Sequence, residues 1–503
     1  MRAIIVHNDR PDSSTVARGR CHNAATMRSG VERRANEPGD TMKKRFLSGM
    51  IGLLAANPVL AMNLIETYEK ALSYDSGIAA ARASFEAQEA ATDVSRANLL
   101  PQVNAFGEAN YTDTESSDQN ADFTTLAYGV RLSQPLFRAD TWYSFDASKF
   151  QSEAARAQYN LAQQQLILDV ASAYFNVLRA ADTLTTARAT EAAIQRQYEQ
   201  AQERFDVGLI AITEVYEARA SYDDSKSQRI AAESDLDIAR EQLARLTGEY
   251  TEELDNLREN FPLGRPEPMD PSQWEATALE QNWTIQAAAF DLNTSEANLK
   301  VAKAGHYPTL DLNASYGKSE IDGLDNGTSL VQRRSSEGTT TEAVIGVTLN
   351  VPLYMGGGTQ AGVRQQRSLV TVAEQSLETT RRDVRVNTRS LFRTVNTNIE
   401  TTSALEQTII SRRSALDATR AGYEVGTRNI VEVLDAERAY YVALRDYANS
   451  RYDYVINTLS LKQAAGTLSP QDLIDLNNWL SASAPGIEAL ANDEETLEGP
   501  VGN

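Results

Sequence analysis

The sequence predicts a mainly α-helical protein that is internally duplicated and carries a small β part. Three observations predict this fold class. A glycine turn between two helical runs occurs twice, 218 residues apart. Apolar residues recur at steps of three and four along the 68 residues 139–206, which contain neither proline nor glycine. Apolar and polar residues alternate in four short segments, as they do in strands with one apolar face.

The two turns have matching sequences, FDVGLIAITEVYEARASY in the first half and AGYEVGTRNIVEVLDAERAYY in the second. Seven positions correspond: Val207, Gly208, Ile212, Glu214, Val215, Ala218 and Tyr222 match Val425, Gly426, Ile430, Glu432, Val433, Ala436 and Tyr440. In each turn the glycine stands where a helix commonly ends, and a new apolar periodicity begins a few residues later. Each turn therefore predicts a helical hairpin, and the match predicts a duplicated unit.

The N-terminal 61 residues are predicted to be absent from the mature protein. Residues 1–41 are rich in arginine and lack apolar periodicity, so we interpret them as a non-native extension. Residues 42–61 have a basic start, a short apolar run and small residues before a cut after Ala61, which is the pattern of a secretory signal peptide. The apolar run is shorter than the ~20 residues of a membrane-spanning helix. The one cysteine, Cys21, lies upstream of the cut, which predicts a mature chain without disulfides or a lipid-attachment cysteine.

The charge of the mature chain disfavours two classes of function. Beyond residue 61 the sequence has 38 Lys and Arg against 64 Asp and Glu, a net charge of −26. Such a chain should repel nucleic acid. Of the three histidines only His306 remains, so histidine-based metal sites and Ser-His-Asp catalysis are poorly supported, and no metal or cofactor is expected.

The first repeat spans residues 62–248 in our interpretation. Its expected elements are a helix over 63–100 interrupted at Ser76-Gly77, strands over 102–111 and 126–134 with the polar loop TDTESSDQNAD between them, and helices over 139–206 and 212–247. Pro101 ends the first helix and Gly248 the last. At 1.5 Å per residue the long helix measures about 100 Å and each short one about 54 Å, so two short helices match one long helix in length.

The second repeat, residues 272–466, follows a proline-rich linker over 249–271. Its expected elements are a helix over 272–304, strands over 310–317 and 343–351, a long helix over 359–425 and a helix over 430–465. The residues that end these elements also correspond: Pro308 matches Pro101, Pro352 matches Pro135, and Gly466 matches Gly248. Residues 467–503 complete the chain, and the acidic part beyond Ser481 is expected to be disordered.

The strand patterns indicate a membrane. Segments of about ten residues that alternate between apolar and polar side chains are typical of transmembrane barrels. Four strands cannot close a barrel, since the smallest use about eight, and an open sheet edge in lipid would leave backbone groups unpaired. The chain is thus expected to share strands with copies of itself, most simply in a trimer with twelve strands. A soluble sheet that caps a helical bundle is the alternative, and it is disfavoured because both hairpins have an apolar face while the long helices already bury one another.

With these motifs the sequence resembles the TolC-type outer-membrane efflux and secretion proteins. The resemblance extends through LNNWL at 476–480, and its most specific parts are GYEVGTRNIVEVLDA, FDVGLIAITEV and the breaks LPQV and YPTL at the strand starts. It implies a homotrimer in the outer membrane, with a twelve-stranded β-barrel continuous with a periplasmic twelve-helix α-barrel. It also implies an equatorial girdle made from the linker and the C-terminal segment.

The function implied by the resemblance is that of an exit duct. The duct would serve a tripartite efflux pump or a type I secretion system and would open by an iris-like movement of its periplasmic helices. The implied partners are a periplasmic adaptor (membrane fusion) protein, an inner-membrane pump of RND or ABC type, and outer-membrane lipid. The alternatives are a coiled-coil envelope tether or adhesin without transport, and a periplasmic adaptor, although the chain lacks the lipoyl-like domains of adaptors.

Glu432 and Asp435 are the candidate periplasmic constriction. They lie three residues apart at the start of a helix and so share a face. In a threefold tube six carboxylates would ring the axis and attract cations, so cation block is expected there. The resemblance supports this role, although aspartate is usual at position 432. A purely structural alternative remains open, because Asn429 with Glu432 three residues on is a capping-box pattern.

Four residues are the candidate gate latch. By resemblance Tyr423 and Arg428 pair with Thr213 and Glu214 of the first turn, where aspartate is usual at position 214. Arginine can bind a carboxylate with two hydrogen bonds, and tyrosine can add another. Alternatively Arg428 is a solvated turn residue and Tyr423 only packs, and most surface ion pairs contribute only about 0 to 1 kcal/mol.

The turn residues Val207, Gly208, Val425 and Gly426 are the candidate adaptor contacts, again by resemblance. Nothing in the sequence predicts an enzyme. The run Gly356-Gly357-Gly358 lacks the lysine of a phosphate-binding loop and is expected to be a joint between strand and helix.

Overall fold

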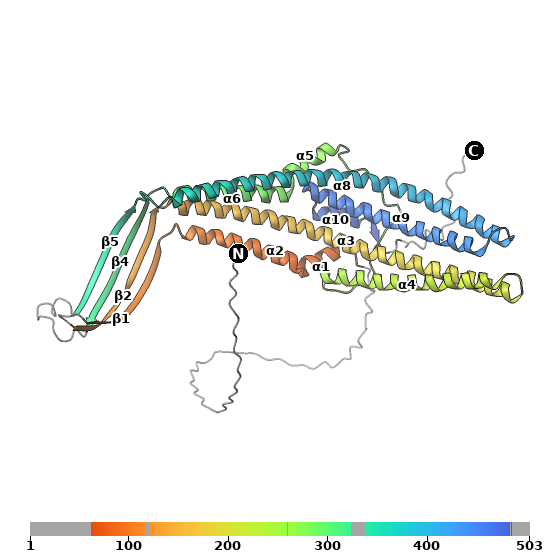
Figure 1. Ribbon diagram of the computed structural model, residues 1–503, viewed down its shortest axis with the longest axis horizontal. Coiled ribbons are helices and arrows are strands. Elements are labelled where there is room, and N and C mark those ends of the chain that lie inside the picture. The colour runs from red at the N-terminus through yellow and green to blue at the C-terminus, as the bar shows by residue number, and fades with distance from the viewer. Residues whose placement is uncertain (1–61, 116–119, 259, 323–337, 483, 485–503) are drawn as a thin grey trace, which may run out of the picture. The chain divides into compact units, whose positions relative to one another are not determined.

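The computed structural model describes residues 62–115, 120–258, 260–322, 338–482 and 484. All of them belong to one compact unit, Val59–Asn503. The predicted N-terminal extension, the signal peptide and most of the predicted disordered tail lie outside the described residues. Within this unit long helices lie side by side, a four-stranded sheet follows at one end of them, and helical turns close the other end (Figure 1).

The described residues of the first repeat form four helices. They are α1 (Leu64–Tyr74), α2 (Ser76–Ala97), α3 (Ala139–Asp206) and α4 (Ile212–Thr247). The interruption that the sequence predicts near Ser76 falls at Asp75, which adopts an extended conformation. Its carboxylate accepts a hydrogen bond of 2.9 Å from the backbone N–H of Ile78. This side-chain cap satisfies a donor that the start of α2 would leave free, so the break costs little.

The second repeat contains α5 (Pro271–Gln281), α6 (Trp283–Ala304), α8 (Gly358–Glu424) and α9 (Ile430–Ala465). The sequence predicts one continuous helix over 272–304, and that prediction is wrong because Asn282 divides it. The Asn282 side chain caps α6 by accepting from the N–H groups of Thr284 and Ile285. It also donates 2.9 Å to the carbonyl of Ala464 at the end of α9. Asn282 and Asp75 occupy equivalent positions, so both repeats break their short helices at the same point.

The four-stranded sheet consists of β1 (Gln102–Glu115), β2 (Asn120–Phe137), β4 (Thr309–Asp322) and β5 (Gly338–Asn350). Its order is β1-β2-β4-β5, and all neighbours are antiparallel. The strands are longer than the alternation predicts, and most of the expected polar loop after residue 111 is strand. Backbone pairing continues as far as Glu115 and Asn120, because a ladder of backbone hydrogen bonds does not require apolar side chains. Both β1 and β5 are open edges.

One face of the sheet is apolar across all four strands. In one row Val103 lies opposite Leu132, Leu132 opposite Ala314, and Ala314 opposite Ile345. In the protomer Val103 is 64% exposed and Ile345 78%, whereas Leu132 and Ala314 are half-buried. An exposed apolar face of this extent calls for a second apolar environment.

Two glycines allow close approach in the middle of the sheet. Gly129 and Gly317 lie opposite each other on β2 and β4. A Cβ atom on Gly129 would stand 2.5 Å from the carbonyl oxygen of Tyr316 and 3.1 Å from the ring of Phe106. The Phe106 ring thus occupies the space that two missing side chains leave on neighbouring strands.

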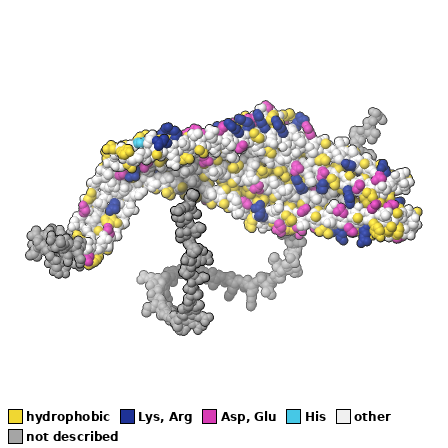
Figure 2. Space-filling model, in the orientation of Figure 1, with side chains coloured by type: hydrophobic (Ala, Val, Ile, Leu, Met, Phe, Trp, Pro, Cys, Tyr) yellow, Lys and Arg dark blue, Asp and Glu magenta, His cyan; other side chains and the backbone are white. Residues whose placement is uncertain are grey.

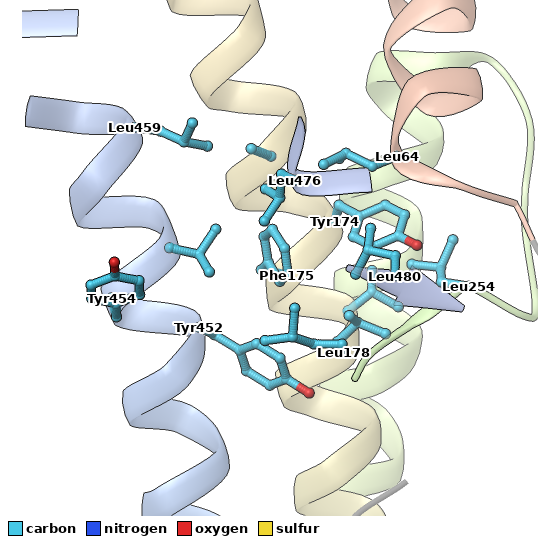
Figure 3. Close-up of a cluster of buried hydrophobic side chains, with 14 of the residues drawn as sticks. Leu64, Tyr174, Phe175, Leu178, Leu254, Tyr452, Tyr454, Leu459, Leu476 and Leu480 are labelled. Carbon is cyan, nitrogen blue, oxygen red and sulfur yellow. The ribbon is translucent and has the colours of Figure 1, made fainter. Parts of the chain in front are cut away.

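The main hydrophobic core lies where α3 and α9 meet the linker and the C-terminal segment (Figure 3). Tyr174 and Phe175 of α3 are fully buried there. The Tyr174 hydroxyl donates to the backbone carbonyl of Asp255 in the linker at 2.8 Å. The Tyr452 hydroxyl of α9 donates to Asp182 of α3 at 2.6 Å, and burial together with this carboxylate raises the pKa of Tyr452. These two hydroxyl groups are thereby paired with groups on elements that are distant in sequence.

The linker and the C-terminal segment meet beside this core. A two-stranded sheet joins β3 (Asn256–Leu257) to β6 (Leu480–Ser481), which follows α10 (Pro470–Asn477). The ring of Phe261 packs edge-on against Trp479 with centroids 6.0 Å apart. The two segments that the resemblance assigns to an equatorial girdle therefore lie together. Among the described residues, no helix is both long and apolar enough to cross a membrane.

Candidate functional site

The two helical hairpins end in turns with the same backbone geometry. Gly208 and Gly426 both have φ of +78°. The N–H of Leu209 donates to the carbonyl of Arg204 at 2.8 Å, and that of Thr427 donates to Gly422 at 2.8 Å. A bond that spans six residues and encloses a left-handed glycine is the helix ending that Gly favours, since other residues rarely adopt positive φ.

Apolar side chains are exposed at both turns. Val207 is 71% exposed, Leu209 73% and Val425 76%. Valine and leucine side chains exposed at the end of a hairpin are not stabilised by contact with water. They form small exposed apolar patches that a partner protein could bury. All four predicted adaptor-contact residues lie at these two turns.

The second turn is supported by a small apolar cluster, which we call the tip cluster. It consists of Ile194, Tyr423, Ile430, Val433 and Leu434, with Tyr222 packed against it. The cluster joins α3, α8 and α9 just behind the turn. The guanidinium of Arg204 lies 4.7 Å from the centre of the Tyr423 ring, a cation–π contact. The Tyr423 hydroxyl is buried and has no hydrogen-bond partner among the described residues.

Arg428 contacts Glu432 within the same turn. Its Nη1 atom lies 2.5 Å from a carboxylate oxygen of Glu432. The side chain of Asn429 caps α9 by accepting a hydrogen bond of 2.9 Å from the backbone N–H of Glu432. The helix-capping role that the sequence offered as an alternative for Asn429 and Glu432 is thus present as an N-cap. Glu432 additionally has Arg428 beside it.

Asp435 shares the face of Glu432 but is more open to solvent. Its side chain is 68% exposed, and its nearest cation is Arg438 at 4.0 Å. Arg438 also lies 3.6 Å from Asp224 on α4. Each predicted constriction carboxylate therefore has an arginine beside it: Arg428 lies four residues before Glu432, and Arg438 lies three residues after Asp435. These arginines reduce the local negative potential.

The remaining predicted latch residues stand apart from these groups in the protomer. Thr213 is exposed and Glu214 half-buried in the first turn of α4. Within the described chain Tyr423 and Arg428 form no hydrogen bond or ion pair with either of them.

A buried ion pair near the tip was not predicted from the sequence. Arg420 of α8 contacts Glu437 of α9 at 2.7 Å, and the Glu437 side chain is only 1% exposed. Its second oxygen is buried without a hydrogen-bond partner. The signal was available, since Glu437 falls between Val433 and Tyr440 on the apolar face of the predicted helix, where a carboxylate needs a partner.

The described residues contain no group of three or more His, Cys, Asp or Glu side chains that could hold a metal ion. The site therefore consists of two capped turns, exposed apolar patches, and ion pairs between neighbouring helices. These are features of a contact region.

Comparison with known proteins agrees with this architecture. The model of the outer membrane efflux protein family matches residues 67–249 and 274–467, which cover most of each repeat and extend one residue past its end. The chain is 37% identical over 441 residues to the outer membrane protein TolC of Vibrio cholerae, and the match covers 87% of this chain and 98% of that protein. It is 27% identical over 451 residues to the alkaline protease secretion protein AprF of Pseudomonas aeruginosa, with 88% of this chain and 92% of that protein covered.

Solved structures show the same fold. The structure of CusC superimposes with a TM-score of 0.69 at 20% identity, over 81% of this chain and 93% of that chain. The CmeC outer membrane channel of Campylobacter jejuni superimposes with a TM-score of 0.68 at 17% identity, over 90% of this chain and 97% of that chain. The predicted fold class, helical and duplicated with a small sheet, is confirmed. On the strength of its sequence match, the chain belongs to the outer membrane efflux protein family.

Proposed function

We propose that three copies of this chain form the exit duct of a tripartite efflux pump or a type I secretion system. The sheets would make a twelve-stranded barrel in the outer membrane, and the helices would make a tube in the periplasm. The duct would be closed at its periplasmic end by the hairpin turns and opened by an iris-like movement of the helices.

The observation that carries the proposal is the four-stranded sheet. Its apolar face is continuous from Val103 on β1 to Ile345 on β5, and both edge strands are unpaired. Lipid tolerates the apolar face but not unpaired backbone groups, so β5 of one copy must pair with β1 of the next. Three copies supply twelve strands, which lies within the range of known barrels.

The helices are arranged to continue this symmetry. Across the sheet-proximal half of the protomer α2 packs on α3, α3 on α6, and α6 on α8. The outer helices of this row are α2 and α8, on the same sides as the edge strands β1 and β5 (Figure 1). Closing the sheet edges therefore also brings α8 of one copy to α2 of the next.

The gate would be held by contacts between hairpins. The buried Tyr423 hydroxyl lacks a partner, and Glu214 has no ion pair among the described residues. In the trimer Tyr423 and Arg428 would bind Thr213 and Glu214 and keep the turns together. Arg428 would then divide its donors between Glu432 and the latch, which its five N–H groups permit.

The latch is tested by the double variant Arg428→Ser with Tyr423→Phe. We expect its trimers to show a higher single-channel conductance in planar bilayers than the wild type, because the turns lose polar contacts that hold them closed. The matched control is Arg381→Ser, which removes an exposed arginine from α8 far from the turns. An unchanged conductance in the double variant would remove the latch from the proposal, and trimers without any conductance would favour the envelope tether or adhesin.

The constriction is tested by cation block. With Glu432 and Asp435 near the axis, divalent cations added on the periplasmic side should block the closed pore, and Glu432→Ala with Asp435→Ala should abolish the block. The structure adds a sharper expectation. Because Arg428 lies 2.5 Å from Glu432, Arg428→Ser should strengthen the block by exposing that carboxylate. A block that is insensitive to all three changes would place the cation site elsewhere.

The proposed partners follow from the exposed turns. Val207 and Val425 would be covered by a periplasmic adaptor protein, which would connect the duct to an inner-membrane pump of RND or ABC type. Relatives named for secretion and relatives named for efflux both exist, since AprF is named for protease secretion and CusC for cation efflux. The adaptor contact is tested by pull-down of adaptors with Val207→Asp and Val425→Asp, which should lose binding while trimers persist.

A further inference from the structure

The two repeats differ in charge where their helices meet the sheet. In the second repeat Lys300 and Lys303 near the end of α6, and Arg364 and Arg367 near the start of α8, are all exposed. None of these four side chains has an ion-pair partner within the described residues. We call them the junction cations. Figure 2 shows Lys and Arg gathered over this end of α6 and α8, beside the one histidine of the described residues and a hydrophobic area next to the sheet.

The first repeat provides an internal reference. The offset of 207 residues between Pro101 and Pro308 places Asp93 and Arg96 at the positions of Lys300 and Lys303. The offset of 218 residues between the turns places Asp146 and Lys149 at the positions of Arg364 and Arg367. The four equivalent charges therefore sum to zero in the first repeat and to +4 in the second. In a mature chain with a net charge of −26, this cluster is not explained by composition.

The acidic side chains nearby do not cancel the difference. Glu296 shares the exposed face of α6 with Lys300, but Glu89 stands at the equivalent position of the first repeat. Asp311, at the start of β4, binds Arg138 through two hydrogen bonds of 2.8 and 2.9 Å. In the first repeat Lys149 is likewise neutralised by Asp146 at 3.0 Å. The excess of positive charge is thus confined to the second junction.

The junction cations lie just below a strongly exposed apolar segment. Leu353 is 93% exposed, Tyr354 84% and Met355 65%, and Tyr307 on the neighbouring connection is 45% exposed. The equivalent residues of the first repeat, Leu136 and Phe137, are only 51% and 49% exposed. Aromatic and apolar residues at the end of transmembrane strands mark the edge of the hydrocarbon layer. The cations therefore stand at the depth of the lipid headgroups.

Helix geometry supports this depth. At 1.5 Å per residue Arg364 lies about 9 Å from the start of α8, and Lys300 about 6 Å from the end of α6. The headgroup layer on each side of a bilayer is roughly 5–8 Å thick. Side chains on a helix point toward its N-terminus, so both arginines on α8, which begins at the sheet, lean toward the sheet, whereas Lys300 and Lys303 on α6, which ends there, lean away from it. Their long stems allow the charged ends to reach headgroup phosphates.

Arg364 also lies on the outer side of the proposed tube. Arg364 precedes Arg385 by three heptads and so shares its face of a supercoiled α8. Arg385 contacts Glu275 of α5 at 2.7 Å, so this is the face that α5 covers further along. A helix inside the tube would obstruct it, which places α5 and the face of Arg364 outside, where lipid is.

From these observations we infer that the junction of the second repeat binds anionic phospholipid headgroups of the periplasmic leaflet, through Lys300, Lys303, Arg364 and Arg367. The trimer would carry three such sites, alternating with three neutral junctions of the first repeat. The inference rests on the proposed placement of the sheet in the outer membrane. Its role would be to hold the duct at a fixed depth and rotation in the bilayer.

The test compares lipid retention by purified full-length trimers. Wild-type trimers are incubated with equimolar phosphatidylglycerol and phosphatidylcholine, and the bound lipids are counted by native mass spectrometry. We expect up to three retained phosphatidylglycerol molecules per trimer and a preference of at least about tenfold, since each cation near an anionic surface contributes a factor of about five. The quadruple variant with Lys300→Gln, Lys303→Gln, Arg364→Gln and Arg367→Gln should lose the preference.

The matched control is Arg96→Gln with Lys149→Gln, at the equivalent positions of the first repeat, and it should retain the preference. An unchanged preference in the quadruple variant, or equal retention of both lipids by the wild type, would overturn the inference. Displacement of the lipid by millimolar inorganic phosphate would overturn it as well, since the site would then bind phosphate ions. The conductance of the same trimers distinguishes failure of the lipid site from failure of the proposed duct. Trimers that conduct but show no lipid preference would refute the lipid site alone. Chains that form no channel would refute the duct and the lipid site together.

Discussion

At the first hairpin, Ala211 begins α4 without a side-chain cap, whereas at the equivalent position of the second hairpin Asn429 caps α9. Further from the turn, the second hairpin is joined by Arg420 and the buried Glu437. The equivalent residues of the first hairpin, Gln202 and Arg219, instead contact neighbours on their own helices, Asp206 at 3.1 Å and Asp223 at 3.9 Å.

The comparison of the two hairpins separates the features that both repeats share from those that differ. Both repeats keep the glycine turns, the lengths of the helices and the breaks in the short helices, because these set the backbone geometry. The polar contacts differ, because a cap or an ion pair adds local stability without changing the fold. The second hairpin is therefore expected to be the more rigid one, and the first hairpin the one that would move more readily in the proposed opening.

The largest expected effect concerns the glycines that end the short helices. A Cβ atom on Gly466 would stand 2.4 Å from the backbone carbonyl oxygen of Gln281, whereas one on Gly248 would meet only the ring of Tyr74 at 2.7 Å. Both have positive φ, near +79° and +77°. We expect Gly466→Ala to cost about 2 to 5 kcal/mol, from backbone strain and overpacking together. Gly248→Ala should cost only about 1 to 2 kcal/mol, because Tyr74 is exposed and can move.

Thermal unfolding of the detergent-solubilised protein, followed by circular dichroism, measures this pair. The comparison between the repeats fails if the two variants unfold at the same temperature.

A smaller effect is expected from the buried ion pair. Arg420→Ala would leave the Glu437 carboxylate buried without a cation, which should destabilise the second hairpin by about 2 to 3 kcal/mol. The control Gln202→Ala, at the equivalent position, removes an exposed contact and should cost less than about 1 kcal/mol. Hydrogen–deuterium exchange of peptides from the two hairpins reports the difference directly. Equal protection of the second hairpin in wild type and Arg420→Ala would show that the pair is not needed there.

The smallest expected effect concerns the helix caps. A side-chain cap can be removed from α9 and introduced at α4. Asn429→Ala should weaken the start of α9 by about 1 kcal/mol, and Ala211→Asn should strengthen the start of α4 by a similar amount. The same exchange measurement applies, now to the first turns of α4 and α9. If the duct yields at its first hairpin, Ala211→Asn should also lower the open probability in planar bilayers, whereas no change there would assign the movement to another element.

Much of the fold follows from local chemistry, so the sequence determines it without tertiary information. The absence of glycine and proline over 139–206 sets the extent of α3, and Gly208 and Gly426 set the turns. Alternation of apolar and polar residues locates the four strands, and the correspondence of Pro101 with Pro308 reveals the duplication. The candidate adaptor residues lie at the turns because that motif specifies the turn itself.

The tertiary structure decided where side chains find partners distant in sequence. Asn282 breaks a predicted helix because the carbonyl of Ala464 lies within its reach, which no local pattern indicates. The strands extend to Glu115 and Asp322 because neighbouring backbones continue to pair there. The sequence placed Tyr423 near the turn, but only packing against the tip cluster buries its hydroxyl without a partner. Backbone conformation depends on neighbours along the chain, whereas burial and pairing depend on what folding brings together.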